Sequence, residues 1–225
     1  MAFYDDLLVA TEDDKQYLLS APIINDVFEG RFTLETYIAF LNQAYHHVRH
    51  TVPLLSNAAD NLRPHQAWIR STLLEYMDEE AGHEAWILDD LAACGCDRKV
   101  YEQADAPLTS DVMVAYLYDY VARKNPLGIF GMVLVLEGTS SSLAPVVADI
   151  VQEKLALTDA AMTYLRTHGE LDQHHINYFE RAMNQVEDAA DQAAIINVAR
   201  VVYQLYGNVY RAIPAAAEDI ARRAA

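Results

Sequence analysis

The stretch that decides the fold reads L-R-T-H-G-E-L-D-Q-H-H-I-N-Y-F-E-R-A-M-N-Q-V and covers residues 165–186. Selected positions in it recur at alternating steps of three and four, the spacing that places side chains on one face of an α-helix. Most of these positions are apolar, but the face also carries ionisable groups; it consists of Leu165, His168, Asp172, His175, Phe179, Ala182 and Val186. The segment is therefore predicted to be a helix that turns His168, Asp172 and His175 toward the protein interior.

Burial of these three side chains needs a chemical reason. An unpaired buried carboxylate costs several kcal/mol or takes up a proton. A divalent metal removes that cost, because it pairs with the carboxylate and uses neutral imidazoles as ligands. The alternatives are that this face meets solvent, or that His and Asp hydrogen-bond each other. The His-x-x-x-Asp-x-x-His spacing on an apolar face favours a metal site, whereas His174 is predicted to point away from it.

The rest of the chain shows the same helical periodicity, and no segment is typical of a strand pair. The predicted helices run over about Phe3–Leu19, Leu34–Leu62 with a kink at Pro53, Pro64–Cys94, Asp111 or Ser110 to Asn125, Pro126–Leu157 with a kink at Pro145, Thr158–Val186 and Ala189–Ile213. The expected boundary residues are Thr33 and Thr158 as N-caps, Gly95 at the end of the third helix and Pro214 after the seventh. Long helices with short connections predict an all-α bundle of about seven helices, folded as a single domain over residues 1–225.

Composition narrows the classes of function. Hydrophobic residues form 52% of the chain, enough for a real core, and the formal net charge of −17 argues against nucleic acid or anionic lipid as a partner. Cys94 and Cys96, in Cys-Gly-Cys, cannot close an ordinary structural disulfide loop, which fits a reduced, cytoplasmic location. The first residues do not resemble a signal peptide, and the longest apolar stretch, Ile129–Leu136, is far shorter than the ~20 residues of a membrane span.

Two further segments carry ionisable groups at predicted interior positions. Glu80 and His83 form Glu-x-x-His, a spacing that puts both side chains on one face of a helix and that occurs in carboxylate-bridged di-iron bundles. An exposed acidic helix would look similar. Glu137 lies in a helix that is apolar on nearly all sides, where a buried ion pair is the alternative to a metal. The glycines near it leave room for a ligand or allow close helix packing; they are Gly128, Gly131 and Gly138.

Together these segments supply three carboxylates and three histidines: Glu80, His83, Glu137, His168, Asp172 and His175. Two Fe²⁺ ions bring four positive charges against three negative charges from these ligands, so one positive charge remains to attract an anionic group. Oxygen and imidazole ligands suit iron, or manganese as a substitute, better than structural zinc. Two such ions with open positions can bind O2 and supply electrons to it.

On these residues the chain resembles the haem-oxygenase-like di-iron oxidases, relatives of the TenA and PQQ-synthesis helical families, from about the second helix to the end. The resemblance implies a haem-oxygenase-like, TenA-like bundle that oxidises a small organic substrate with O2 and an external reductant. It implies that Glu80, His83 and His168 hold one iron and that Glu137, Asp172 and His175 hold the other, with Glu80 bridging. Desaturation, C–C cleavage and oxygenation, on carboxylic or amino acids, are reactions of this family.

The chain departs from the family in an earlier helix, where some members use a further carboxylate. Here the segment Asn42–His50 contains no acid, so Gln43, His46, His47 and His50 either approach the metals, orient a substrate, or make ordinary hydrogen bonds. The side chains predicted to line a substrate pocket are Gln43, Tyr45, His47 and Tyr76. Val202, Tyr203, Tyr206 and Val209 are predicted to line that pocket or a homodimer interface.

Four other functions remain as alternatives. A haem protein is disfavoured, because the histidines cluster with acids instead of standing alone opposite an apolar pocket. A TenA-like thiamine-degrading enzyme needs a nucleophilic cysteine, but Cys94 and Cys96 lie at the end of the third helix. A cofactorless oxidase of the PQQ-synthesis type would line its pocket with histidines, yet it leaves the carboxylates unexplained. A non-catalytic bundle that stores or senses iron would bind metal without consuming O2.

Overall fold

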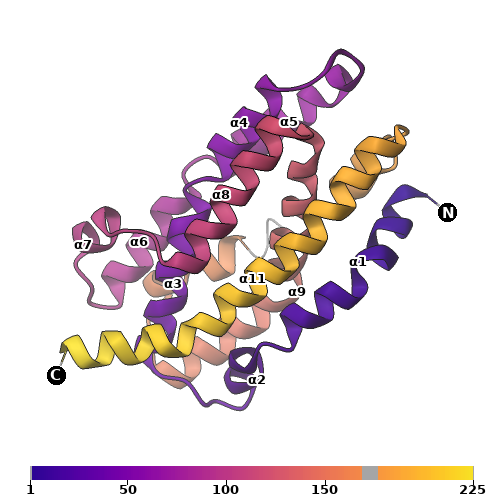
Figure 1. Cartoon of the computed structure of the whole chain (residues 1–225). Helices are drawn as coiled ribbons and strands as arrows, with labels where there is room; N and C mark the ends of the chain where they lie inside the picture. Colours follow the sequence, from indigo (N-terminus) through magenta and orange to yellow (C-terminus); the bar gives the residue numbers. More distant parts are fainter. Residues whose placement is uncertain (1, 169–176, 225) are drawn as a thin grey trace.

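The computed structural model describes residues 2–168 and 177–224, and within these residues all regular structure is helical. The elements pack as one elongated bundle, with the two ends of the chain at opposite ends of the molecule (Figure 1). They are α1 (Phe3–Leu19), α2 (Pro22–Phe28), α3 (Leu34–Val48), α4 (Thr51–Asp60), η1 (Pro64–Ile69), α5 (Arg70–Glu80), α6 (His83–Ala93), α7 (Arg98–Gln103), α8 (Leu108–Arg123), η2 (Pro126–Gly128), α9 (Ile129–Leu155), η3 (Asp159–Ala161), η4 (Tyr164–His168) and α11 (Ala189–Ala224). A further helical segment covers residues 177–183.

The longest of these elements, α11, runs along the bundle and packs against α1, α2, α3, α8 and α9. Its approach to α9 depends on Gly131, where a Cβ atom would lie 2.5 Å from the backbone nitrogen of Ala199 and 2.6 Å from the carbonyl oxygen of Ile195. Of the two roles predicted for the glycines, Gly131 therefore serves close helix packing.

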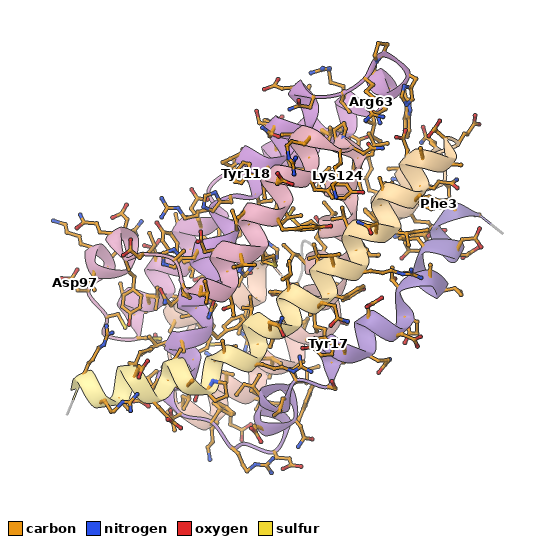
Figure 2. The ribbon with its side chains drawn as sticks, viewed as in Figure 1. Phe3, Tyr17, Arg63, Asp97, Tyr118 and Lys124 are labelled. Carbon is orange, nitrogen blue, oxygen red and sulfur yellow. The ribbon has the colours of Figure 1, made fainter. Side chains whose placement is uncertain are left out.

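The contact between α1 and α11 includes Tyr17, which lies beside α11 (Figure 2). Its hydroxyl donates to the side chain of Asn208 at 2.7 Å, and the Arg211 guanidinium lies 3.9 Å from its ring.

The central helix of the fold is α9. The segment Pro126–Leu155 is long and apolar enough to cross a membrane by length and composition, but 67% of its most apolar window is buried inside the bundle. That burial is the behaviour of a core helix, since apolar surface removed from water by neighbouring helices contributes to the stability of the fold.

Several predicted boundaries are confirmed. α1 has the predicted bounds, and Thr33 caps α3 in a reciprocal pair of hydrogen bonds with Thr36. Gly95 follows α6 with a φ of +89°, a left-handed conformation that glycine adopts without steric cost. α9 continues through Pro145, as predicted, and Asn125 caps the short turn before it by accepting from the Leu127 amide at 3.1 Å.

Two predictions about proline are wrong. The predicted second helix does not merely kink at Pro53 but divides into α3 and α4 at Arg49 and His50. Pro53 then lies in the first turn of α4, where its missing N–H is not needed. By contrast, Pro214 does not end the last helix, since α11 continues to Ala224. Ile213 and Ala217 on either side of it are buried in a small apolar cluster, and this packing offsets the lost hydrogen bond.

Three other predictions also need correction. The predicted third helix begins with the 3₁₀ segment η1 and divides again between α5 and α6, at Ala81 and Gly82. α8 begins at Leu108 instead of at Ser110 or Asp111, because the Ser110 hydroxyl donates to the side chain of Gln43 at 2.6 Å and is not a cap. Thr158 makes no capping hydrogen bond.

The decisive segment 165–186 is not one regular α-helix. Tyr164–His168 forms a π-helical turn, a conformation that often marks functional sites. The described members of the predicted interior face are nevertheless buried, as expected; they are Leu165, His168, Phe179, Ala182 and Val186. The prediction of which side chains face inward is confirmed for these residues, whereas the regular helix that motivated it is not.

Candidate metal centre

Three of the predicted ligands converge inside the bundle. Glu80 Oε2 lies 3.2 Å from Nδ1 of His83 and 3.6 Å from Nε2 of His168. The three side chains can each place a ligand atom within 4.8 Å of the other two, and all three are buried. The rings of His83 and His168 meet edge to face at 5.1 Å between centroids. A carboxylate and two imidazoles therefore surround one small volume.

The contact between Glu80 and His83 does not arise from their positions on one helix. Glu80 is the last residue of α5 and His83 is the first residue of α6, so the two do not share a continuous helix. The chain turns between them at Gly82, whose φ of +91° is readily accessible only to glycine. This turn brings the His83 ring back to the end of α5, and Trp86 stacks on that ring at 4.2 Å.

His168 reaches the site because α6 anchors the segment that carries it. Asp90 of α6 is fully buried and accepts hydrogen bonds from the backbone amides of Thr163 at 3.0 Å and Tyr164 at 2.9 Å. Burial raises the pKa of Asp90 to about 6, against the opposing effect of these hydrogen bonds. The carboxylate thus holds the start of η4 against α6, and η4 ends at His168.

The carboxylate at the centre is held ionised by its neighbours. Burial alone would raise the pKa of Glu80, but the hydrogen bonds and charges of His168 and His83 outweigh it and lower this pKa to about 2. The oxygen that lies near both histidines is Oε2. Glu80 Oε1 is buried and has no hydrogen-bond partner in the part of the chain that the structure describes. A buried oxygen of this kind is costly unless a cation or donor satisfies it.

A cavity beside the three side chains also contains Glu137. Its walls include Glu80 and His168 together with Glu137, Tyr76 and His47. Glu137 is 8% exposed, and its charge is one of the influences that, after burial, raise the pKa of the Tyr76 hydroxyl. The structure therefore places the predicted Glu137 and Tyr76 on the same cavity as Glu80 and His168.

The α3 residues divide between this cavity and other surroundings. His47 lines the cavity, and its Nδ1 lies 2.8 Å from the carbonyl oxygen of Gln43. Because that oxygen can only accept, Nδ1 carries a proton, and burial lowers the pKa of His47 to about 4, so the ring is neutral at pH 7. The neutral ring keeps Nε2 as an acceptor.

The other α3 residues lie elsewhere. Gln43 hydrogen-bonds Thr109 and Ser110 of α8, and Tyr45 packs against the His46 ring and the Arg49 guanidinium. Neither lines the cavity, so the predicted pocket roles of Gln43 and Tyr45 are not supported. His50, which follows α3, contacts the hydroxyl of Tyr118. His46 is buried, and its Nε2 has no hydrogen-bond partner among the described residues.

The remaining predicted ligands, Asp172 and His175, lie outside the described residues, and their assignment stays a prediction. Several cavity residues were missed in the sequence, and Tyr164, Ser140 and Thr51 are those with a hydroxyl group. Tyr164 precedes His168 by four positions, and its ring lies 5.1 Å from the His168 ring. That helical spacing was a signal that could have identified it, whereas the single hydroxyl of Ser140 offered none.

The two cysteines lie apart from this centre. Cys94 follows the last residue of α6, and neither Cys94 nor Cys96 lines the cavity. Burial, followed by the neighbouring Cys96 and Asp90, raises the pKa of Cys94 to about 12. A thiol that stays protonated is a poor nucleophile, which weakens the thiamine-degrading alternative.

Solved structures resemble this one over nearly the whole chain. A domain of unknown function with a haem-oxygenase-like fold from Shewanella denitrificans OS217 has a TM-score of 0.84 at 21% identity, covering 95% of this chain and 92% of that one. A TenA homologue from Pseudomonas syringae pv. tomato DC3000 has a TM-score of 0.78 at 13% identity, covering 94% and 92%. Haem oxygenase-1 from Synechocystis sp. PCC 6803, solved with haem, has a TM-score of 0.75 at 12% identity, covering 100% and 98%. The fold is the haem-oxygenase-like all-α bundle.

Sequence comparison assigns the chain to a family. The profile of a family described as iron-containing redox enzymes matches residues 38–207. The chain belongs to this family. None of the curated proteins compared with the chain matches it.

Proposed function

We propose that this protein is an O2-dependent non-haem di-iron oxidase of a small organic substrate. The observation that carries the proposal is the buried group of Glu80, His83 and His168, whose central carboxylate keeps one oxygen, Oε1, without a hydrogen-bond partner among the described residues. Membership of the iron-containing redox family supports iron as the cation that satisfies this oxygen. Mixed carboxylate and imidazole donors also suit iron or manganese.

The described residues bring together ligands for one ion, and the resemblance to the di-iron oxidases suggests a second. Glu80, His83 and His168 would hold one iron. Glu137, on the wall of the same cavity, would contribute to a second iron together with Asp172 and His175, and Glu80 would bridge the two. In this arrangement Glu80 Oε1 is available to the second ion.

The surrounding residues prepare the site for oxidation. Iron(II), when bound by these residues, would supply electrons for the activation of O2, and an external reductant would restore them. Burial of Glu80, His83 and His168 keeps bulk water away from the reacting groups. His47, held neutral with Nδ1 protonated, offers Nε2 as an acceptor for a substrate proton at the cavity wall. The proposed outcome is desaturation, C–C cleavage or oxygenation of the substrate.

The partners proposed for this reaction are O2, a small organic molecule and a reductant, in a cytoplasmic setting. The formal charge of −17 makes nucleic acid and anionic membrane surfaces unfavourable partners. A homodimer would use a surface other than Val202, Tyr203 and Val209, because these side chains are buried in the core of one chain.

The test is stopped-flow absorption and O2 uptake of the iron(II)-loaded protein, mixed aerobically with a panel of organic acids, amino acids and uncharged hydrocarbons. The wild-type protein is expected to give an O2-dependent visible transient and to consume O2 faster with one of these compounds. Glu80→Gln should reduce both signals at least about tenfold, because it removes a ligand and not only an outer contact. His65→Ala, which changes an exposed histidine away from this cavity, is the matched control and should behave as wild type.

Two results would contradict the proposal. Absence of O2 consumption by the wild-type protein across the panel, with iron bound at full stoichiometry, would favour a bundle that stores or senses iron. Undiminished O2 consumption by Glu80→Gln would place the reacting centre elsewhere.

A further inference from the structure

A second and more apolar chamber adjoins the cavity of the metal centre. It lies between α2, α3, α9, η4 and α11 and is partly open to solvent. Aromatic rings dominate its wall: Phe32, Tyr37, Phe40, Tyr164, Tyr206 and Tyr210. The rest of the described wall is aliphatic or carries a small hydroxyl, as at Ile23, Val27, Leu143, Val147 and Ser140.

This wall offers nothing that would neutralise a charge. None of the described residues that line the chamber is Asp, Glu, Lys, Arg or His. Two of its polar groups are already used within the protein, since the Tyr37 hydroxyl donates to the carbonyl oxygen of Ala161 at 2.7 Å and the Thr139 hydroxyl donates to that of Val135 at 2.6 Å. Transfer of a charged group from water to such surroundings is unfavourable, whereas transfer of hydrocarbon is favourable.

The chamber shares part of its wall with the cavity of the metal centre. Ser140, Tyr164 and Tyr206 line both the chamber and the cavity that contains Glu80, Glu137 and His168. A molecule that fills the chamber therefore has one end at this shared boundary, next to the side chains proposed to hold iron.

We propose that the chamber binds the uncharged hydrocarbon portion of the substrate and presents the end of that portion to the metal centre. The class of substrate is thus a molecule with an apolar body, and any charged group that it carries lies at the metal end or in solvent. This excludes compact zwitterions, such as small amino acids, as molecules bound in the chamber. The claim that the substrate reacts at the end next to the metal centre rests on the proposed function. The claim that the chamber binds hydrocarbon does not.

The test measures binding of straight-chain alcohols to the metal-free protein by isothermal titration calorimetry. Affinity is expected to rise about fourfold for each added methylene from butanol upward and to stop rising when the chamber is full. Norleucine, which has a similar chain but a zwitterionic end, should bind at least about tenfold more weakly than the alcohol of equal chain length.

Two neighbouring valines of α9 give a matched pair of variants. Val147 lines the chamber, whereas Val146 is 50% exposed and does not line it. Val147→Trp fills space in the chamber and should weaken binding of the longest bound alcohol at least about tenfold, because several methylenes lose their site. Val146→Trp should bind this alcohol as the wild type does. Thermal unfolding of both variants verifies that they fold.

The outcomes separate this inference from the proposed function. Affinity independent of chain length, or equal binding by a folded Val147→Trp variant, overturns the chamber as a hydrocarbon site. Chain-length-dependent binding to a protein that consumes no O2 with iron would sustain the chamber and overturn only the oxidase.

Discussion

Among the described residues, two groups of histidine and carboxylate side chains differ in their burial and in their hydrogen bonds. In Glu80, His83 and His168 all three side chains are buried, and one carboxylate oxygen has no hydrogen-bond partner among the described residues. In His65, Asp188 and Asp191 the ligand atoms also lie within 4.8 Å of one another, but only Asp191 is buried. Residue types and distances are therefore alike, and the surroundings distinguish the two groups.

The carboxylates of the second group are already occupied. Asp191 Oδ1 accepts hydrogen bonds from the side-chain amides of Gln66 at 2.7 Å and Asn125 at 2.8 Å, and Asp188 Oδ1 accepts from the backbone amide of Ala190 at 2.9 Å. Arg63 and Lys124, which precede His65 and Asn125 in this region, lie toward one end of the bundle (Figure 2), and Arg63 donates to the Lys124 carbonyl oxygen at 2.6 Å. The comparison teaches that a cluster of ligand types can be satisfied by amide groups of the protein, whereas Glu80 Oε1 has no hydrogen-bond partner among the described residues.

The largest effect is expected for iron binding. Glu80→Ala should lower the affinity for iron(II) at least about a hundredfold, because the central carboxylate of the buried group is lost. Asp188→Ala, at the other group, should leave iron affinity unchanged. Equilibrium dialysis with elemental analysis measures both. If Asp188→Ala lowered the bound iron as much as Glu80→Ala does, the two groups would not differ in the way described.

Asp191→Ala should instead lower the free energy of unfolding, by about 2–3 kcal/mol, since it leaves the buried amides of Gln66 and Asn125 without their acceptor. Urea unfolding of the metal-free protein measures this loss. Iron affinity is expected to stay at the wild-type value, and a stable Asp191→Ala variant would show that the second group is not structural.

The neutral ring of His47 should make the metal-free protein sensitive to acid. Its pKa is about 4 in the folded protein, below the ordinary value of 6.5, so the unfolded chain binds the proton more readily. Stability that is present above pH 6.5 should be lost as the pH falls toward 4, by about 2 kcal/mol at pH 5. His47→Gln should lack this part of the loss, which urea unfolding at pH 7 and pH 5 measures. Equal pH dependence of both proteins would contradict the burial of a neutral His47.

The smallest effect concerns the turn that joins the two halves of the buried group. Gly82→Ala should lower the free energy of unfolding by about 1 kcal/mol, because alanine is strained at a φ of +91° although no atom lies within 4 Å of its Cβ position. Gly82→Asn, which tolerates this conformation better, should lose less. Chemical denaturation compares them, and equal stability of the alanine variant and the wild type would indicate that the turn changes its conformation.

Much of the arrangement could be predicted from sequence, because it depends on periodicity. The bounds of α1, the Thr33 cap, the Gly95 terminus and the inward positions of Leu165, His168 and Phe179 all follow from the spacing of apolar and capping residues. The meeting of Glu80 with His83 was also predicted, but for the wrong reason. A continuous helix was expected, and the structure joins them through a left-handed turn at Gly82.

Other features could not be predicted from the spacing of residues, because they depend on contacts between segments that are distant in the sequence. The role of Ser110 is set by Gln43 on another helix, and the continuation of α11 through Pro214 depends on buried neighbours such as Ile213. Asp90 looked like an ordinary acidic residue, yet it anchors the segment that carries His168.

By itself, the sequence determined which side chains face the interior, and hence that histidines and carboxylates would be buried together in an all-helical protein. Only the tertiary structure decided which of them meet and that an apolar chamber adjoins the site. It also decided that amides satisfy Asp191, while Glu80 Oε1 has no hydrogen-bond partner among the described residues. The physical reason is that burial follows from local periodicity, whereas hydrogen-bond satisfaction and cavity shape depend on groups that are far apart in the chain.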